Sequence, residues 1–170
     1  QRYNYHMAKE AGIYPYFHQL HSGQDTKVIM EGIDTVMIGS NNYLGLTSHP
    51  EVIKAGVEAL EKYGSGCSGS RFLNGTTTLH IQLEKELAEF LGKEDCVTMS
   101  TGFQTNLGVI SAIAGRNDVV LCDKENHASI YDGCRLSYAK LLRYNHSDME
   151  DLERILKNVP ENAGKMIITD

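Results

Sequence analysis

A turn of small residues near position 100 has the residue types that bind phosphate. The segment MSTGFQTN passes from an apolar run to a helix-forming run through Ser100, Thr101 and Gly102, and Phe103 begins the second run. The first N–H groups of a helix have no partner within the helix, and the helix dipole adds a positive field there. The turn therefore indicates a phosphate site, although such turns also occur as plain connections in alternating folds.

A histidine follows the next apolar run. VVLCD from Val119 leads into DKENHAS, which contains His127. If both apolar runs are parallel strands, His127 lies at the same carboxyl edge as the turn of small residues, and open sheets bind ligands at that edge. A flat imidazole beside a phosphate site suits a flat phosphorylated cofactor. A histidine before a helix can also be a helix cap or a surface residue.

The glycine-rich stretch YGSGCSGSRFLNGT at residues 63–76 contains GxGxxG. A dinucleotide-binding fingerprint needs a strand directly before its glycines. Here a predicted helix precedes them, so Gly64 is interpreted as the end of that helix. The acidic residue about 20 positions further on, Glu84, is expected to be a solvated carboxylate in an amphipathic helix. No GK[ST] follows, so a Walker loop is excluded as well.

The surrounding pattern predicts an α/β fold. Apolar runs that alternate with amphipathic stretches are typical of a parallel sheet buried on both faces. An N-terminal arm at residues 1–45 should hold a short tyrosine-rich helix and a hairpin around Glu31 and Gly32. Ser147 and Glu150 form a predicted capping box. We expect helices at 49–63, 78–91, 103–114, 127–137 and 147–159, and strands at 96–100, 119–123, 140–144 and 165–170.

Composition narrows the class of protein. The formal net charge of -6, without long basic runs, argues against a nucleic-acid partner. No apolar run reaches the roughly 20 residues of a membrane span, and no signal peptide is evident, so we expect a cytoplasmic protein. Four cysteines without a CxxC pair suggest neither a metal site nor a disulfide framework. The first residue is not Met, and the last apolar run ends at Asp170 where a loop should follow. We therefore expect a piece of a longer protein.

Five motifs occur in the order and spacing of one enzyme family: SNNYLGL, HPEVIKAG, GTTTLHIQLE, STGFQTN and NHASIYDG. From about residue 15 to its end, the chain resembles the α-oxoamine synthases, which use pyridoxal 5'-phosphate (PLP) to condense an amino acid with an acyl-CoA and release CO2. The resemblance implies the large domain of a fold type I, class II aminotransferase-like transferase. Residues 1–45 would be its arm, and residues 46–170 the first part of its PLP-binding large domain.

The resemblance also implies roles for individual residues. It assigns the cradle of the cofactor phosphate to Thr101, Gly102 and Phe103. His127 would stack on the cofactor ring, touch the amino-acid substrate and act in catalysis. The glycine loop would be a flexible backbone at the interface of a homodimer, facing the partner's acyl channel. The implied substrate-binding residues are Asn42, Tyr43, Ser70, Arg71 and Phe72.

Within the family, the likeness is greatest to the bacterial branch that joins L-serine to a long-chain acyl-CoA, the first step of sphingolipid synthesis. Phe72 supports this, because an apolar ring gives a charged acyl group no donor. The product would be a lipid that brings peripheral membrane contact. The alternatives are 2-amino-3-ketobutyrate CoA ligase and 8-amino-7-oxononanoate synthase.

The family's Schiff-base lysine and the aspartate at the pyridine nitrogen are expected beyond Asp170, and no lysine present here is assigned that role. A non-catalytic partner subunit or remnant is therefore the alternative of another class. We expect the isolated 170 residues to be inactive in either case.

Overall fold

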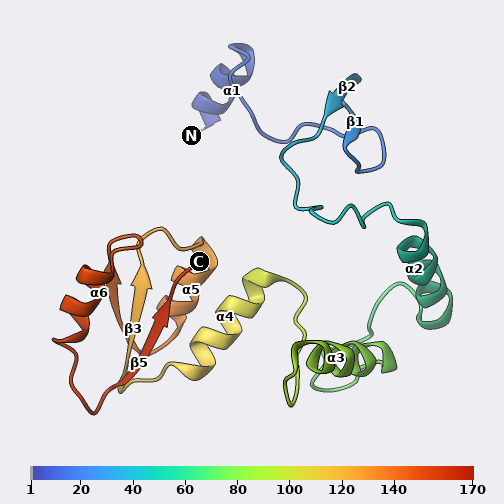
Figure 1. Cartoon of the computed structure of the whole chain (residues 1–170). Coiled ribbons are helices and arrows are strands. Elements are labelled where there is room, and N and C mark those ends of the chain that lie inside the picture. Colours follow the sequence, from blue (N-terminus) through green and yellow to red (C-terminus); the bar gives the residue numbers. More distant parts are fainter. Residues whose placement is uncertain (1) are drawn as a thin grey trace. The chain divides into compact units, whose positions relative to one another are not determined.

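The computed structural model describes residues 2–170, with side chains from Tyr5 onward. The chain forms two compact units, one up to Thr76 and one from Thr77 to Asp170. We describe each unit by itself (Figure 1). The domain boundary predicted between residues 45 and 46 concerns the whole protein and stays a prediction.

The first unit contains the predicted hairpin. Glu31 and Gly32 both have positive φ, 50° and 80°. A turn with two such residues matches the right-handed twist of the strands that it joins. The two strands pair antiparallel, with Met30 opposite Ile33, so the hairpin prediction is confirmed. A short helix precedes the hairpin and a longer helix follows it. The elements are α1 (Arg2–Glu10), β1 (Lys27–Met30), β2 (Ile33–Val36) and α2 (Pro50–Tyr63).

Helix α2 begins and ends at the residues expected from the sequence. The His49 Nδ1 accepts a hydrogen bond from the Glu51 N–H at 3.3 Å, and Pro50 occupies the first turn. At the other end Gly64 has φ 82°, a conformation that favours glycine. A helix and not a strand leads into the GxGxxG segment, which agrees with the exclusion of a dinucleotide fingerprint.

The second unit is built on a three-stranded parallel sheet. Its strands are β3 (Asp118–Asp123), β4 (Lys140–Tyr144) and β5 (Gly164–Ile168), in the order β4-β3-β5. Its helices are α3 (Thr78–Leu91), α4 (Gly102–Ile113), α5 (Ala128–Leu136) and α6 (Met149–Leu156). The predicted alternation and the parallel sheet are confirmed.

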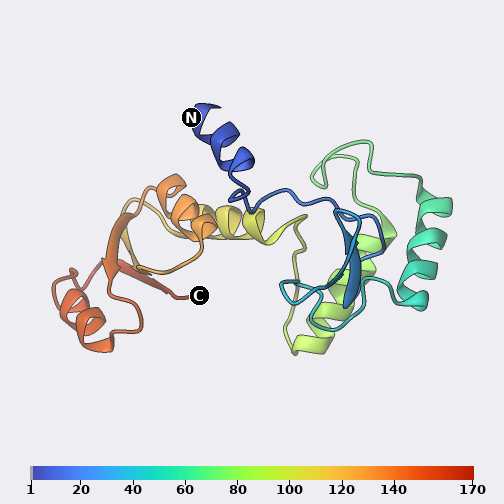
Figure 2. The same cartoon turned by 90° about the horizontal axis from the view of Figure 1, so that it is seen from above.

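Strand β3 is buried along most of its length because both of its faces are covered. Val120 and Cys122 pack among side chains of α4 and α5. Val119 and Leu121 point to the opposite face, where they pack with residues of β4 and α6. Alternate side chains of a strand point to opposite faces, so a continuous apolar run fits a strand between two helical layers. Figure 2 shows α4 and α5 on one side of the sheet and α6 on the other.

The predicted strand at residues 96–100 is wrong, and so is the expectation of a solvated Glu84. A strand needs a neighbour, and within the described residues 96–100 pair with no strand. Instead, the Thr98 N–H and hydroxyl donate to Glu84 Oε1 at 2.9 and 3.0 Å. Glu84 is only 9% exposed. A buried carboxylate is tolerated when hydrogen bonds replace its water, and Glu84 thereby holds the segment that leads to α4.

The predicted capping box of α6 is also wrong. Asp148 is the N-cap, and its carboxylate accepts from the Asp151 N–H at 2.9 Å. Ser147 is unsuited to that position, because its φ is 52° and its N–H donates to Asp123 Oδ2 at 3.0 Å. The sequence pattern matched a capping box, but the backbone of Ser147 is used to close a turn onto the end of β3.

All four cysteines are free thiols. Cys122 and Cys134 are buried, and burial raises the pKa of the Cys134 thiol to about 11. That thiol therefore stays protonated at neutral pH and serves as an apolar packing group. Separately, none of the helices within residues 2–170 is both long and apolar enough to traverse a bilayer.

Candidate cofactor site

The N-terminus of α4 presents free hydrogen-bond donors. Thr101 is the N-cap, and its hydroxyl oxygen accepts from the Gln104 N–H at 3.1 Å. The N–H groups of Gly102 and Phe103 donate to no acceptor within the described chain. A Cβ built at Gly102 would have no heavy atom within 4 Å, so this backbone is open to a ligand. Two free donors at the positive end of a helix dipole favour an anion such as phosphate.

His127 lies beside this turn. It is the N-cap of α5, where its Nδ1 accepts from the Ser129 N–H at 3.1 Å. Its exposed ring meets the Phe103 ring edge-on, with centroids 6.3 Å apart and an interplanar angle of 80°. The structure therefore brings together the turn and the histidine that the sequence placed at one edge of the sheet.

Two residues that the sequence reasoning missed hold the segment before His127. The His127 N–H donates to Asp170 Oδ2 at 3.1 Å, which links it to the chain after β5. The buried Asn126 side chain donates to the Ile168 carbonyl at 3.0 Å and to Cys122 Sγ at 3.1 Å. Asn126 comes four residues after Cys122 and Asp170 two residues after Ile168, and a polar residue in the loop after an apolar run is a signal that could have marked them as loop anchors.

In the first unit, Asn42 and Tyr43 line a shared hollow. Asn42 shapes its own turn, because its N–H donates to Ser40 Oγ at 3.0 Å and its Oδ1 accepts from the Thr47 N–H at 3.2 Å. Tyr43 is exposed. The lining consists of Gln24, Ser40, Asn41, Asn42, Tyr43, Leu44, Leu46 and Thr47. The predicted substrate roles of Asn42 and Tyr43 stay predictions.

The second half of the glycine loop is a hydrogen-bonded turn, and the predicted flexibility of the loop stays a prediction. The Ser70 carbonyl accepts from the N–H groups of Leu73 and Gly75 at 3.1 and 2.8 Å. The Thr76 hydroxyl donates to the Arg71 carbonyl at 2.7 Å, and Arg71 Nε donates back to Thr76 Oγ1 at 3.3 Å. This turn presents Phe72, which is 93% exposed.

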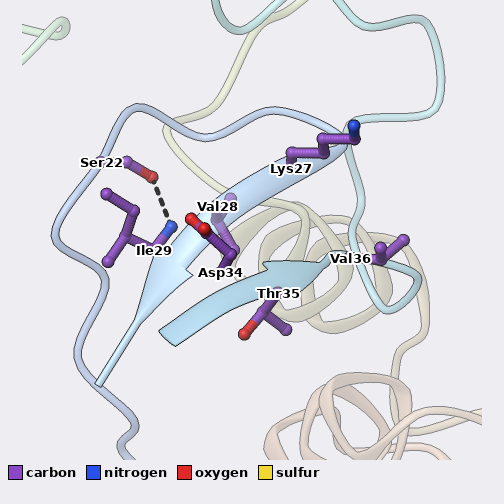
Figure 3. A pocket seen from close by; sticks show the side chains of 7 residues that line it. All are labelled: Ser22, Lys27, Val28, Ile29, Asp34, Thr35 and Val36. Atoms are coloured by element: carbon purple, nitrogen blue, oxygen red, sulfur yellow. Dashed lines mark hydrogen bonds between the residues drawn. The ribbon is translucent and has the colours of Figure 1, made fainter. Parts of the chain in front are cut away.

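A further hollow lies on the hairpin of the first unit, where the Ser22 hydroxyl accepts from the Ile29 N–H at 3.0 Å (Figure 3). Its lining residues are Ser22, Lys27, Val28, Ile29, Asp34, Thr35 and Val36. None of the residues predicted from the sequence to bind cofactor or substrate is among them. The structure therefore assigns this hollow no part in the candidate site.

The family model for aminotransferase class I and II matches residues 33–170. The chain belongs to this family. Among similar family members, the serine palmitoyltransferase of Sphingobacterium spiritivorum is 52% identical over 95% of the chain and 41% of its own length. The 8-amino-7-oxononanoate synthase of Thermoanaerobacter pseudethanolicus is 48% identical over 95% and 41%. The resemblance to α-oxoamine synthases is thereby confirmed, and the chain spans about two-fifths of these relatives.

A solved structure agrees with this family assignment. A serine palmitoyltransferase from S. paucimobilis with a bound PLP-myriocin aldimine has a TM-score of 0.93 and 39% identity. The match covers 98% of our chain and 42% of that protein. The predicted fold type is therefore confirmed for the portion of the large domain that the chain contains.

The donors at the start of α4 fit the PLP that was bound in that structure. The cofactor phosphate is an anion that accepts hydrogen bonds, and the free N–H groups of Gly102 and Phe103 supply them. The flat ring of His127 nearby suits a flat heterocycle. The start of α4 therefore has donors that fit the cofactor phosphate, and His127 has a flat ring that fits the cofactor ring.

The carboxylate of Asp123 fixes the carboxyl end of β3, from which the loop to His127 departs. Asp123 is 1% exposed. It accepts from the N–H groups of Glu125 and Ser147 at 2.8 and 3.0 Å, and from His146 Nδ1 at 3.0 Å. The Glu125 N–H is the main cause that lowers the pKa of Asp123, and Ser147 and His146 add to it. The hydrogen bond to Asp123 raises the pKa of His146.

These pKa directions predict a pH dependence of stability. Because the pKa of His146 is raised from 6.5, its contribution is complete below pH 6.5 and is lost as pH rises through the raised value. The contribution of Asp123, whose pKa is lowered from 3.8, is lost only as pH falls through the lowered value. We expect the difference in Tm between the wild type and His146→Gln to shrink as pH rises from about 6 to 9.

The matched control for this pH series is His21→Gln, since His21 has no carboxylate partner within residues 5–170. This variant shows how replacing a histidine away from Asp123 affects Tm over the same pH range. A His146→Gln difference that stays constant with pH would contradict the assignment of the Asp123 and His146 pair.

Proposed function

We propose that the protein containing this chain is a PLP-dependent acyltransferase that condenses L-serine with a long-chain acyl-CoA, releases CO2 and forms a 3-oxo amine. The observation that carries the proposal is the pair of free N–H groups of Gly102 and Phe103 beside the exposed ring of His127. The serine palmitoyltransferase relatives give the substrate class. A relative of similar sequence identity, 48%, is named 8-amino-7-oxononanoate synthase, and this makes that activity the second candidate.

Each residue of the turn has a separate part in binding. The N–H groups of Gly102 and Phe103 would donate to the cofactor phosphate. The Thr101 hydroxyl oxygen already accepts from Gln104 and keeps its O–H for the same anion. His127 would lie against the cofactor ring and orient the amino acid. When bound, PLP supplies an electron sink for the carbanion at the amino-acid Cα, and the chain supplies binding, orientation and cover from water.

In the first unit, Asn42, Tyr43, Ser70, Arg71 and Phe72 are the proposed substrate-binding residues. The exposed ring of Phe72 offers apolar surface and no donor. A long uncharged acyl chain gains from that surface, whereas a carboxylated acyl group would lose water without gaining a partner. Serine with palmitoyl-CoA should therefore be a better substrate pair than serine with an acyl-CoA that carries a terminal carboxylate. Equal rates would favour the second candidate function.

Further features of the whole protein are proposals that rest on its family. They are a homodimer whose interface includes the glycine loop, a cytoplasmic location, and peripheral contact with a membrane through the lipid product. The opposing hypothesis, a non-catalytic partner subunit, predicts PLP or acyl-CoA binding without turnover.

Replacing His127 by alanine tests the cofactor role in the full-length protein. We expect PLP affinity to fall by up to about tenfold, because a stacked ring contact contributes roughly 0.5–1.5 kcal/mol. The absorption band of bound PLP and its response to serine should change as well. Spectroscopic titration of PLP measures both quantities.

The control for the titration is His6→Ala, at an exposed position of α1, which should bind PLP as the wild type does. If the folded full-length protein gave no PLP absorbance, the proposed function would be wrong. An unchanged titration of the alanine variant at residue 127 would refute the role of His127 alone.

A further inference from the structure

A buried hydroxyl lies next to the ring of His127. Ser129, in the first turn of α5, is 1% exposed, and its Oγ lies 2.6 Å from His127 Nδ1. On its other side, the Asn106 side chain of α4 donates to the same oxygen through Nδ2 at 2.9 Å. The three side chains therefore form one line of hydrogen bonds that ends at the exposed ring.

The direction of these hydrogen bonds is set by groups that can only donate. The Ser129 backbone N–H donates to His127 Nδ1 at 3.1 Å, so that ring nitrogen is an acceptor. Because Nδ1 is an acceptor and Asn106 already donates to Ser129 Oγ, the contact between Ser129 Oγ and Nδ1 must be made by the serine hydrogen. A neutral imidazole with an acceptor at Nδ1 carries its proton on Nε2.

The hydrogen bonds that link Asn106, Ser129 and His127 depend on how closely α4 and α5 approach each other. A Cβ built at Gly133 would lie 2.8 Å from the Asn106 carbonyl oxygen and 3.1 Å from Ile110 Cδ1. Real Cβ atoms do not come so close to a backbone oxygen, so only glycine allows this separation of the helices. The contact places Asn106 within reach of Ser129, which lies one turn nearer the start of α5.

We propose that Ser129 and Asn106 are positioning residues that hold His127 in the tautomer with its proton on Nε2. The ring then presents an N–H donor at its exposed edge and no lone pair. Their importance for turnover rests on the proposed function, whereas the tautomer itself is a property of the chain. Neither residue needs to touch cofactor or substrate, because both act through the ring.

The test uses full-length protein labelled with 15N-histidine and freed of cofactor, with His127→Gln to assign the ring signals. The two ring nitrogens have distinct 15N shifts when protonated and when bare, so the spectrum reports the tautomer directly. We expect a bare Nδ1 and a protonated Nε2 in the wild type. Ser129→Ala should give a mixture of both tautomers, because one of two donors to Nδ1 is removed.

Asn106→Asp provides a variant of the same size that should shift the tautomer in the same direction as Ser129→Ala, and further. A carboxylate would accept the Ser129 hydrogen, and the serine oxygen would then face Nδ1 as an acceptor. We expect this change to move the proton of His127 toward Nδ1. In the PLP-loaded enzyme, both variants should lower kcat more than they raise KM, since ring orientation and not binding area is altered.

Ser137→Ala is the matched control, because Ser137 is another buried serine at the far end of α5 that donates to the Cys134 carbonyl at 2.8 Å. Its loss should leave the ring signals of His127 as in the wild type. A wild type with the proton on Nδ1, or Asn106→Asp without effect on the ring signals, would overturn the proposal. Loss of PLP absorbance with the expected tautomer would instead refute the proposed function alone.

Discussion

Gly133→Ala is expected to destabilise the full-length protein by about 1–3 kcal/mol, the range for overpacking of a well-filled contact. A new Cβ at residue 133 would lie 2.8 Å from a backbone carbonyl of α4, which no change of rotamer can move. The helices would have to separate, and Asn106 would lose Ser129. We therefore expect a lower Tm together with altered ring signals of His127 and weaker PLP binding.

Gly56→Ala is the matched control for this substitution. Gly56 also lies inside a helix, α2, but a Cβ there meets no heavy atom within 4 Å. Alanine has the better helix propensity by about 1 kcal/mol, so this variant should be neutral or more stable. If Gly133→Ala were as stable as Gly56→Ala, the close approach of α4 and α5 would not be a constraint.

Gly75→Ala is expected to open the glycine loop. A Cβ at residue 75 would lie 1.9 Å from the carbonyl oxygen of Gly69 and 2.7 Å from its carbon, and both are backbone atoms. The turn must widen, which breaks the bond of 2.8 Å from the Gly75 N–H to the Ser70 carbonyl. We expect a loss of about 1–3 kcal/mol in stability and, because Phe72 is displaced, a raised KM for acyl-CoA.

Gly69→Ala separates this steric effect from a general need for glycine in the loop. A Cβ at residue 69 would meet the end of the Asn74 side chain at 1.7 Å, and that side chain can turn away. Gly69→Ala should therefore be the milder variant in both Tm and KM. Equal effects of the two variants would indicate that loop flexibility, and not the backbone contact, matters.

The elements that the sequence predicted well are those with local signals. Helix α2 ends at a glycine with positive φ, and the hairpin turns at Glu31 and Gly32. Strand β3 was evident because an unbroken apolar run of this length fits a strand covered on both faces. His127 does lie beside the α4 turn as predicted, but the rule that parallel strands share a carboxyl edge is not the reason, because residues 96–100 form no strand. The close packing of α4 against α5 brings the two together.

The features that the sequence could not predict depend on contacts between distant residues. Glu84 binds Thr98, 14 residues away, and nothing in an amphipathic helical pattern distinguishes such a carboxylate from a solvated one. Asn106 and Ser129 are 23 residues apart and meet only because Gly133 allows two helices to approach. In the glycine loop, the sequence could not show that Gly75 is needed for a close backbone approach, since close approach and flexibility use the same residue.

The position of β3 in the chain has a consequence for synthesis of the protein. β3 is the central strand of its sheet, yet it precedes both of its neighbours in the chain. The second neighbour, β5, ends at Ile168, about 45 residues after the end of β3 at Asp123. Until then, the run VVLC carries unpaired edges of the kind that promote aggregation during folding. Asp118 and Asp123 flank the run, and their charges would act as gatekeepers against association of nascent chains.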